Sequence, residues 1–486
     1  MQFKYQIRTD WPCLAWFATL TPGGSDIPVQ HGSRVESHPD FFCEATWDGE
    51  FENADFDLTE CVFGSGARIR GDRLTVVSSA SVTDRLVSFH DGNRFYLSNS
   101  LVCLLTVLEL QCDPLYPYYY DDIFSITRGI NHYARHFATD RGDVILHYFR
   151  NLAWDNKQLH TLEKPLSKPV LRDFADYRNF MVSSLTALCN NFKSPGRNTT
   201  YQSVSNASLG YDSLAVSVLS MEIGNRDVIS FEKGRSGYDD SGAHLIEQLG
   251  MSPVILDRSA WHQAPFSELP FLAADACGRD TIFYSARQWL NQRVLLSGYH
   301  GGAMWDRFGH IFDPDLSRKD NAGLSHTEFR LIHGYLHVPV PMLGATSVKQ
   351  IQTINRSEEM TPWRLRKRFY DRPLPRRIIE EAGIDRDSFG TKKNAASSHL
   401  FSTREFERYI DNGSTFRDYM TWFRQVSRHH EAKAKYRPQM NNWQRIMVPM
   451  FRHLFPWALQ HMRGYYDGRG GVRYRSSPKT GRQQSA

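Results

Sequence analysis

The segment YQSVSNASLGYDSLAVSVLS, residues 201–220, is the most informative part of the chain. Its first part, Tyr201–Ala207, is rich in Tyr, Val and Ser and predicts a buried strand. Its last part, Leu214–Leu219, is apolar and continues a predicted helix. The residues between them, SLGYDS at 208–213, form a tight turn with small hydroxylated residues. A strand, a turn and a helix start make a cradle for anions, because the first N–H groups of a helix and its dipole both favour negative charge.

The side chains of this turn suit a phosphate group. Gly210 allows the backbone to approach a phosphate closely, and the hydroxyls of Ser208 and Ser213 can donate hydrogen bonds to it. The Asp212 carboxylate would repel a phosphate unless Mg²⁺ lay between the two, so Asp212 is the predicted metal ligand. The alternative is an ordinary helix start at which Asp212 and Ser213 act as capping residues.

Length and composition describe a multidomain globular protein. The 486 residues suggest two or three domains, and 41% hydrophobic with 23% charged residues is a globular composition. A net charge of +5 fits an enzyme that acts on nucleotides or acidic substrates, and it does not require nucleic acid as a partner. The seven cysteines are odd in number and form no CxxC pair, which predicts neither a disulfide framework nor a zinc site and favours a reducing cytoplasm.

The first region, residues 1–165, is predicted to be rich in β-strands. Phe3–Ile7 alternates, and Val87–Phe89 and Phe95–Leu97 flank a turn typical of a hairpin. Leu101–Leu110 is an apolar run too short to cross a bilayer and predicts a buried helix. The N-terminus lacks the apolar core of a secretory signal, so we expect a cytoplasmic protein with no membrane partner.

The second region, residues 166–463, alternates between predicted strands and helices. Alternation of this kind predicts a doubly wound parallel sheet that binds ligands at the carboxyl ends of its strands. The last segment, residues 464–486, is rich in Gly, Arg and Ser and predicts a disordered basic tail. Beyond the first strand and helix, the predicted elements are the strand Asp227–Phe231, the helix Ala243–Leu249 and the strands Val254–Leu256 and Val294–Ser297.

The SLGYDS turn resembles the SGGxDS pyrophosphate loop of the asparagine synthetase and β-lactam synthetase family. Four positions match, and Leu209 replaces the first glycine of that motif. A second stretch, VLLSGYHGGAMWD at 294–306, resembles the LLSGEGxDE stretch of the same family through Ser297 and Gly298. Here Gly302 stands where the family has its second metal-binding Asp. The residues His300, Asp306 and Asp239 are out of register as substitutes, and an ordinary strand-to-helix turn is the alternative.

The resemblance implies an α/β architecture with a β-sandwich of the N-terminal-nucleophile type followed by an ATP-pyrophosphatase domain. It implies ATP and Mg²⁺ as cofactors, with phosphates on Ser208, Gly210, Tyr211 and Ser213, and with adenine near Ser230, Phe231, Ser297 and Gly298. A substrate carboxylate would be adenylated, pyrophosphate released, and an amide formed by attack of ammonia or an amine. Lys393 or Lys392, with Lys393 preferred, would stabilise the developing charge; a solvated basic surface is the alternative.

One departure from the family concerns its glutaminase. Members that hydrolyse glutamine expose a Cys at the mature N-terminus, whose thiolate attacks the amide. This chain has Gln2 there, and its nearest thiol is Cys13. We therefore expect no glutaminase activity and a nucleophile that is free ammonia or an amine, with a small-molecule or peptide carboxylate as the acyl substrate.

Two other classes of function remain open. Because Leu209 and Gly302 depart from the pattern, the chain can also be a catalytically degenerate protein that binds a nucleotide or serves as an interaction partner. The basic tail leaves RNA binding as an alternative, although we do not expect nucleic acid as a partner. His333 and His337 are four residues apart, and we interpret them as structural histidines because prolines follow them directly.

Overall fold

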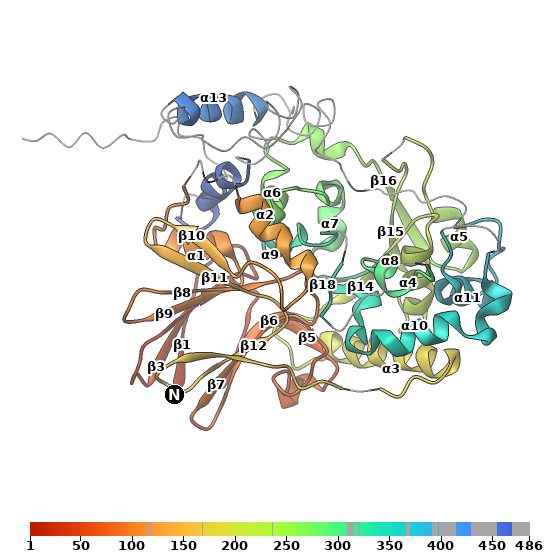
Figure 1. Ribbon diagram of the computed structural model, residues 1–486, viewed down its shortest axis with the longest axis horizontal. Coiled ribbons are helices and arrows are strands. Elements are labelled where there is room, and N and C mark those ends of the chain that lie inside the picture. Colours follow the sequence, from red (N-terminus) through yellow and green to blue (C-terminus); the bar gives the residue numbers. More distant parts are fainter. Residues whose placement is uncertain are drawn as a thin grey trace, which may run out of the picture.

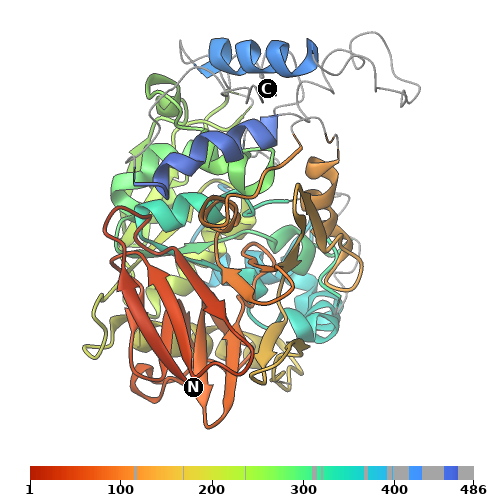
Figure 2. The same cartoon turned by 90° about the vertical axis from the view of Figure 1, so that its left-hand side faces the viewer.

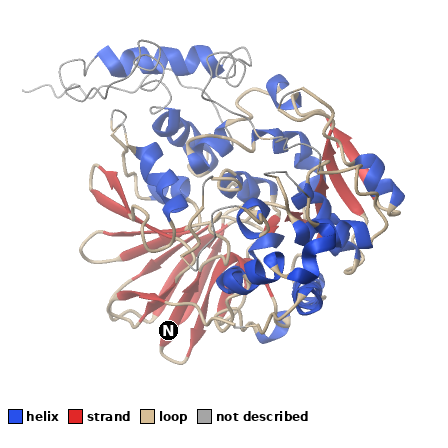
Figure 3. Ribbon diagram, turned by 45° about the vertical axis from the view of Figure 1, so that its right-hand side comes forward, coloured by secondary structure: helices blue, strands red, loops and turns tan. Residues whose placement is uncertain are grey.

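The chain folds into an α/β structure with three β-sheets in its described part (Figure 1). Two sheets are built from the first region of the chain, and the third from the second region. In Figure 3 the strands of the first region gather on one side, and the third sheet lies on the other among helices. The computed structural model describes residues 1–113, 116, 118–167, 169–235, 237–308, 315–318, 321–365, 370–390, 397, 415–428 and 454–468.

The first two sheets pack face to face. Among the described residues one has seven strands and the other six. The seven-stranded sheet has the order β1 (Gln2–Ile7), β3 (Asp26–His31), β2 (Trp16–Leu20), β9 (Phe95–Ser98), β8 (Leu86–His90), β11 (Gly142–His147), β10 (His136–Thr139). The six-stranded sheet has the order β13 (Leu159–Leu162), β12 (Asn151–Trp154), β7 (Arg73–Val77), β6 (Val62–Arg70), β5 (Phe41–Trp47), β4 (Glu36–Ser37).

A shared apolar core holds these two sheets together. Trp16 from β2 and Leu97 from β9 bury their side chains with Phe42 from β5 and Val76 from β7. The Trp16 indole N–H donates to the Ser65 hydroxyl at 3.0 Å, so its polar atom is satisfied inside the core. The predicted hairpin is confirmed as the antiparallel pair β8 and β9. Figure 2 faces this part of the molecule.

The third sheet is parallel throughout the residues described. Its order is β16 (Ser252–Leu256), β15 (Asp227–Phe231), β14 (Gln202–Ala207), β17 (Arg293–Ser297), β18 (Leu336–Pro339). The chain starts at the central strand β14, winds outward through β15 and β16, and returns to the other side of β14 with β17. The predicted doubly wound parallel sheet is therefore confirmed, and its topological switch point lies between β14 and β17.

Helices surround the third sheet and join it to the first region. α3 begins at Phe174, where the Asp173 carboxylate accepts the Asp176 N–H as a cap. The helix predicted at Leu101–Leu110 is confirmed at its start, where the Ser100 hydroxyl accepts the Cys103 N–H, but it ends at Val107, and Glu109 shortly after it has a left-handed backbone conformation with φ of 53°. The described helices are α1 (Leu101–Val107), α2 (Tyr119–Phe124), α3 (Phe174–Lys193), α4 (Tyr211–Met221), α5 (Ala243–Gln248), α6 (Leu269–Asp275), α7 (Arg287–Leu290), α8 (Gly301–Met304), α9 (His326–His333), α10 (Val348–Arg356), α11 (Pro373–Glu381) and α13 (Thr415–Arg428).

Short 3-10 turns and a C-terminal helical segment complete the structure. The turns are η1 (Phe51–Asn53), η2 (Ser125–Arg128), η3 (Ala260–Gln263), η4 (Thr281–Ala286), η5 (Val340–Met342), η6 (Ala345–Ser347), η7 (Glu358–Trp363) and η8 (Arg463–Tyr465). Residues 454–462 are helical, and Trp457 there packs edge-on against Tyr419 of α13 at 5.4 Å. The prediction that a disordered tail begins at 464 is wrong, because residues 464 and 465 belong to η8 and Tyr466 is buried; the rest of the predicted tail, residues 469–486, lies outside the described residues. Within the described helices, none is both long and apolar enough to cross a membrane.

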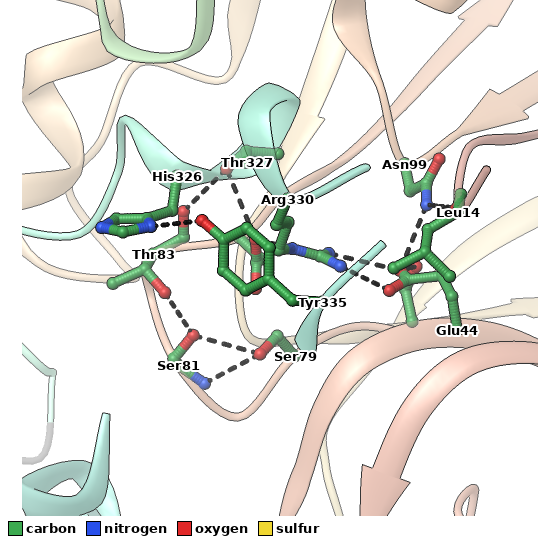
Figure 4. A network of polar contacts seen from close by, with 12 residues as sticks. Leu14, Glu44, Ser79, Ser81, Thr83, Asn99, His326, Thr327, Arg330 and Tyr335 are labelled. Carbon is green, nitrogen blue, oxygen red and sulfur yellow. Dashed lines mark hydrogen bonds and ion pairs between the residues drawn. The ribbon is translucent and has the colours of Figure 1, made fainter. Parts of the chain in front are cut away.

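A buried polar network connects the first region to the second (Figure 4). Arg330 of α9 donates to Glu44 of β5 at 2.5 Å and to Asp84 at 2.8 Å, and all three side chains are buried. Thr327, one turn before Arg330 in α9, adds to the link, since its hydroxyl donates to the Thr83 carbonyl at 3.1 Å. The predicted domain boundary at 165/166 falls between β13 and α3 and stays a prediction, because buried residues of both regions share one apolar core.

Candidate functional site

A cavity of about 380 Å³ lies where the third sheet changes winding direction. Doubly wound sheets bind ligands at this place, outside the carboxyl ends of the strands. The volume is within the range of small-molecule sites. Its lining residues include Asn206, Ala207, Ser208, Gly210, Asp212, Ser213, Phe231, Arg235, Asp240, Arg279, Asp280, Ile282, Phe283, Ser297, Gly298, Tyr299, Ala322, Tyr370, Arg372 and Ser397.

The SLGYDS turn forms one wall of this cavity. β14 ends at Ala207, and α4 begins at Tyr211 with Gly210 as its N-cap. The Ser208 hydroxyl accepts the Gly210 N–H at 3.1 Å and lies 2.8 Å from the Ser213 hydroxyl. The N-cap of α4 is Gly210, which has no side chain to cap the helix, so neither Asp212 nor Ser213 occupies the N-cap position. The first N–H groups of an eleven-residue helix therefore start at the cavity, beside two hydroxyls.

The second predicted stretch packs directly against this turn. A Cβ on Gly298 would lie 2.5 Å from the Ser213 nitrogen, so only glycine permits this approach of β17 to the start of α4. Ser297 is buried, and its hydroxyl lies 2.7 Å from His337 Nε2. Burial lowers the pKa of His337, which leaves a neutral imidazole that can accept this bond. Ser297 thus faces the cavity chiefly with its backbone.

Asp212 contacts a cation that belongs to the protein. Its carboxylate accepts a hydrogen bond from the guanidinium of Arg372, which is 3% exposed. A Cβ on Gly302 would lie 2.9 Å from Arg372 Nη2, so the position at which the resembled family carries its second carboxylate faces this guanidinium. Burial lowers the pKa of Arg372, but the Asp212 carboxylate and other neighbours raise it more, so the side chain stays charged.

These residues do not fit a protein-held Mg²⁺. That ion needs octahedral oxygen ligands, usually including one or two carboxylates. Asp212 is the one predicted ligand, and its carboxylate is bound to Arg372. His300, Asp306 and Asp239, the considered substitutes, do not line the cavity. In the described part of the chain no group of three or more His, Cys, Asp or Glu side chains is placed to hold a metal.

Aromatic and apolar side chains also line the cavity. Phe231 and Phe283 meet edge to face at 5.3 Å, with Ile282 beside them. The Tyr299 hydroxyl donates to Asp280 at 2.6 Å, so this carboxylate is held in place. Such a surface suits a flat, apolar ring or an aliphatic chain of a ligand.

Two predicted site residues point away from the cavity. Ser230 is buried in the sheet, where its hydroxyl donates to the Ala207 carbonyl at 3.2 Å. The Tyr211 ring packs at 4.9 Å from Tyr370 and accepts a hydrogen bond from buried Arg376. Ser230 and Tyr211 can therefore offer a ligand only their backbone groups, and the predicted place of adenine beside Ser230 stays a prediction.

Other candidates lie elsewhere. Lys392 and Lys393 fall outside the described residues, so their predicted role is untested. His333 ends α9, whereas His337 lies in β18, which confirms that they do not share one helix face. Arg377 binds Glu359 and Glu381 on the far side of α11 and does not line the cavity.

Three arginines of the cavity were missed from the sequence. Arg372 directly precedes α11, and the missing carboxylate at Gly302 was the signal that could have revealed it, because Asp212 then needs another cation. Arg235 and Arg279 also line the cavity. No hydrogen bond or ion pair joins Arg279 to another described residue, and its Nε is buried. A half-buried guanidinium that lines a cavity without such a partner favours an anionic ligand.

Cys13, the nearest thiol to the N-terminus, is not set up as a nucleophile. Its Sγ lies 3.5 Å from the Leu331 carbonyl and 3.6 Å from the Ile332 carbonyl. Burial raises the pKa of this thiol, which disfavours the reactive thiolate.

Comparisons with known proteins leave the site as the main guide to function. The chain matches no protein-family model, and no curated protein sequence matches it significantly. Function is therefore inferred from the cavity, its charges and the motifs that line it.

Proposed function

We propose that the chain is an ATP-dependent ligase that adenylates a substrate carboxylate, releases pyrophosphate and forms an amide with ammonia or an amine. The observation that carries this proposal is the meeting of the two motif stretches, SLGYDS and Ser297–Gly298, in one cavity at the switch point of the third sheet. They are far apart in the sequence, and each resembles a nucleotide-binding stretch of the same family.

The phosphates of ATP would bind at the turn. The hydroxyls of Ser208 and Ser213, the first N–H groups of α4 and the charge of Arg372 supply hydrogen bonds and positive charge there. The backbone of Ser297–Gly298 and the Phe231 ring border the place proposed for adenine. Arg279 and Arg235 would hold the substrate carboxylate through their guanidinium groups.

The proposed reaction has two steps. A carboxylate oxygen of the substrate forms a bond to the α-phosphorus, and the bond from that phosphorus to pyrophosphate breaks with its electron pair on the leaving oxygen. The amine nitrogen then bonds to the acyl carbon and gives up a proton to water, and AMP leaves with the electron pair of the C–O bond. The protein contributes positioning and charge stabilisation, to which Lys393 or Lys392 would add.

The N-terminal sheets and the cysteines support two further parts of the proposal. We propose that the two facing sheets are a sandwich of the N-terminal-nucleophile type without glutaminase activity, since Cys13 is bonded to main-chain carbonyls and disfavoured as a thiolate. All seven cysteines are free thiols, which favours a reducing compartment such as the cytoplasm.

Calorimetric titration with ATP tests the phosphate site. In the Ser208→Ala/Ser213→Ala variant we expect affinity to fall at least about tenfold, because a hydrogen bond to a charged group contributes about 1.5–3 kcal/mol. Ser183→Ala, which removes an exposed hydroxyl on α3, is the matched control and keeps the wild-type affinity. Equal affinity in all three proteins would rule out this turn as the phosphate site. Release of pyrophosphate is then screened with mixtures of carboxylates and amines.

The second candidate is a nucleotide-binding protein without catalysis. It is favoured by one observation, the ion pair that already satisfies Asp212 in place of a metal. ATP binding without pyrophosphate release, across a broad panel of carboxylates and amines, would support this candidate over the ligase.

A further inference from the structure

Arg372 is the cation that contacts Asp212 at the start of α4. Its segment enters α11, which packs against α4, and its guanidinium lies 4.8 Å from the Tyr370 ring centre. The side chain is 3% exposed and reaches the Asp212 carboxylate at the start of α4. One arginine therefore connects the anion cradle to the helix behind it.

Two glycines make room for this pair. A Cβ on Gly301 would lie 2.4 Å from Asp212 Cγ, and one on Gly302 would lie 2.9 Å from Arg372 Nη2. The first carbon of a carboxylate side chain at position 302 would therefore clash with the Arg372 guanidinium. The glycine at this position leaves room for the Arg372 side chain. A carboxylate at 302 and the arginine at 372 would compete for the same space, so the structure has the arginine in place of the carboxylate.

The guanidinium keeps donors for a ligand. Arg372 gives Nη1 to Asp212, while its Nε is buried without a hydrogen-bond partner among the described residues. A guanidinium carries five N–H donors in a planar fork that matches phosphate oxygens, and it stays charged at every physiological pH. Asp212 then orients the fork, a use of its carboxylate that requires no metal.

We propose that Arg372 supplies the positive charge at the SLGYDS turn that a metal ion would otherwise supply. The chain binds the phosphates of its nucleotide through the Arg372 guanidinium, without a protein-held metal ion. The inference rests on the proposed function for the identity of the nucleotide, but the anion site itself does not. Asp212 positions Arg372, and Arg372 contacts the ligand.

ATP and inorganic pyrophosphate are titrated calorimetrically, each with excess EDTA and with Mg²⁺. Wild type is expected to bind ATP in EDTA with an affinity within about fivefold of its affinity in Mg²⁺. The Arg372→Met variant should bind ATP at least about tenfold more weakly than wild type in EDTA and in Mg²⁺ alike, because it lacks a charge-assisted hydrogen bond. Arg372→Lys keeps the charge but loses the fork, and should fall between the two. Arg377→Met, on the same helix but outside the cavity, is the matched control and binds as wild type.

A double variant that removes the arginine and adds a carboxylate distinguishes a change in the binding mode from a loss of folding. Gly302→Asp combined with Arg372→Met restores a second carboxylate beside Asp212 and should bind ATP only with Mg²⁺. ATP binding that needs Mg²⁺ in wild type and is unchanged in Arg372→Met would overturn the inference. If ATP does not bind but pyrophosphate binds in EDTA and needs Arg372, the inference stands and the proposed function fails; if neither binds, both fail.

Discussion

Replacing Arg330 with methionine is expected to destabilise the protein by about 3–5 kcal/mol, because the change leaves two buried carboxylates without their cation. Arg330 is 1% exposed and bonds Glu44 and Asp84, which are 2% and 5% exposed. Methionine fills much of the same volume, so the cost comes from charge and hydrogen bonding (Figure 4).

The same structure predicts how this cost changes with pH. Burial raises the pKa of Glu44, and Arg330 opposes that rise in the wild type. Without Arg330 the pKa of Glu44 rises further, so in the variant folding favours the protonated carboxyl. A group whose pKa is raised in the folded state is stabilising at low pH, and this contribution is lost as pH rises. The Arg330→Met cost should therefore be smaller at pH 5 than at pH 8.

Urea unfolding followed by circular dichroism and tryptophan fluorescence measures this cost. The second variant, Glu44→Gln/Arg330→Met, should recover about 1–3 kcal/mol of the loss at pH 8, because one of the two unpaired charges is gone. Arg172→Met is the control, since Arg172 pairs with Asp176 on the exposed surface of α3 and should cost under about 1 kcal/mol. A cost below about 1 kcal/mol for Arg330→Met, or no recovery in the double variant, would refute the assigned role of the network.

Three further predictions follow from buried titratable groups. Burial raises the pKa of Glu268 from 4.5 to about 8, so stability should fall as pH rises from about 4 to 8, and Glu268→Gln should remove this part of the pH dependence in urea unfolding. Burial lowers the pKa of Lys164 from 10.5 to about 7, so wild type should gain stability relative to Lys164→Met as pH rises from about 7 to 10, which urea unfolding of the two proteins at several pH values would show. Cys13 should react with iodoacetamide at neutral pH more slowly than free cysteine by at least about tenfold, as peptide mass analysis would show, and fast labelling would contradict its assignment as a partly buried, hydrogen-bonded thiol.

The local part of the fold could be predicted because it depends on short-range patterns. The strand, turn and helix around residues 201–221 are encoded by a change from a Val- and Ser-rich run to an apolar helix with Gly210 between them. The Ser100 cap and the β8–β9 hairpin have equally local signals. Doubly wound topology then follows from the alternation of strands and helices.

The sequence could predict site residues only where the local backbone geometry determines their position. Ser230 and Phe231 are neighbours on one strand, so their side chains point to opposite faces, and only Phe231 lines the cavity. The alternation along the strand shows that Ser230 and Phe231 lie on opposite faces of the sheet, but it does not show which of the two side chains lines the cavity. Arg372 could not be placed because its position depends on α11 packing against α4, a contact between segments about 160 residues apart.

Three glycines beside the cradle provide a last test, because an added methyl group meets a different kind of obstacle at each. At Gly298 it would lie 2.5 Å from backbone atoms of the turn, at Gly301 it would lie 2.4 Å from the short Asp212 side chain, and at Gly302 it would lie 2.9 Å from the flexible end of Arg372. Backbone yields least and a long side chain most, so the loss of stability and of ATP affinity should rank Gly298→Ala first, Gly301→Ala second and Gly302→Ala last, with overpacking costs of about 1–3 kcal/mol for the first. In an Arg372→Met background the cost of Gly302→Ala should vanish while that of Gly298→Ala persists. Equal losses of stability and of ATP affinity at all three positions would mean that the backbone of the turn shifts as easily as the Arg372 side chain. The site would then not be a preformed anion cradle.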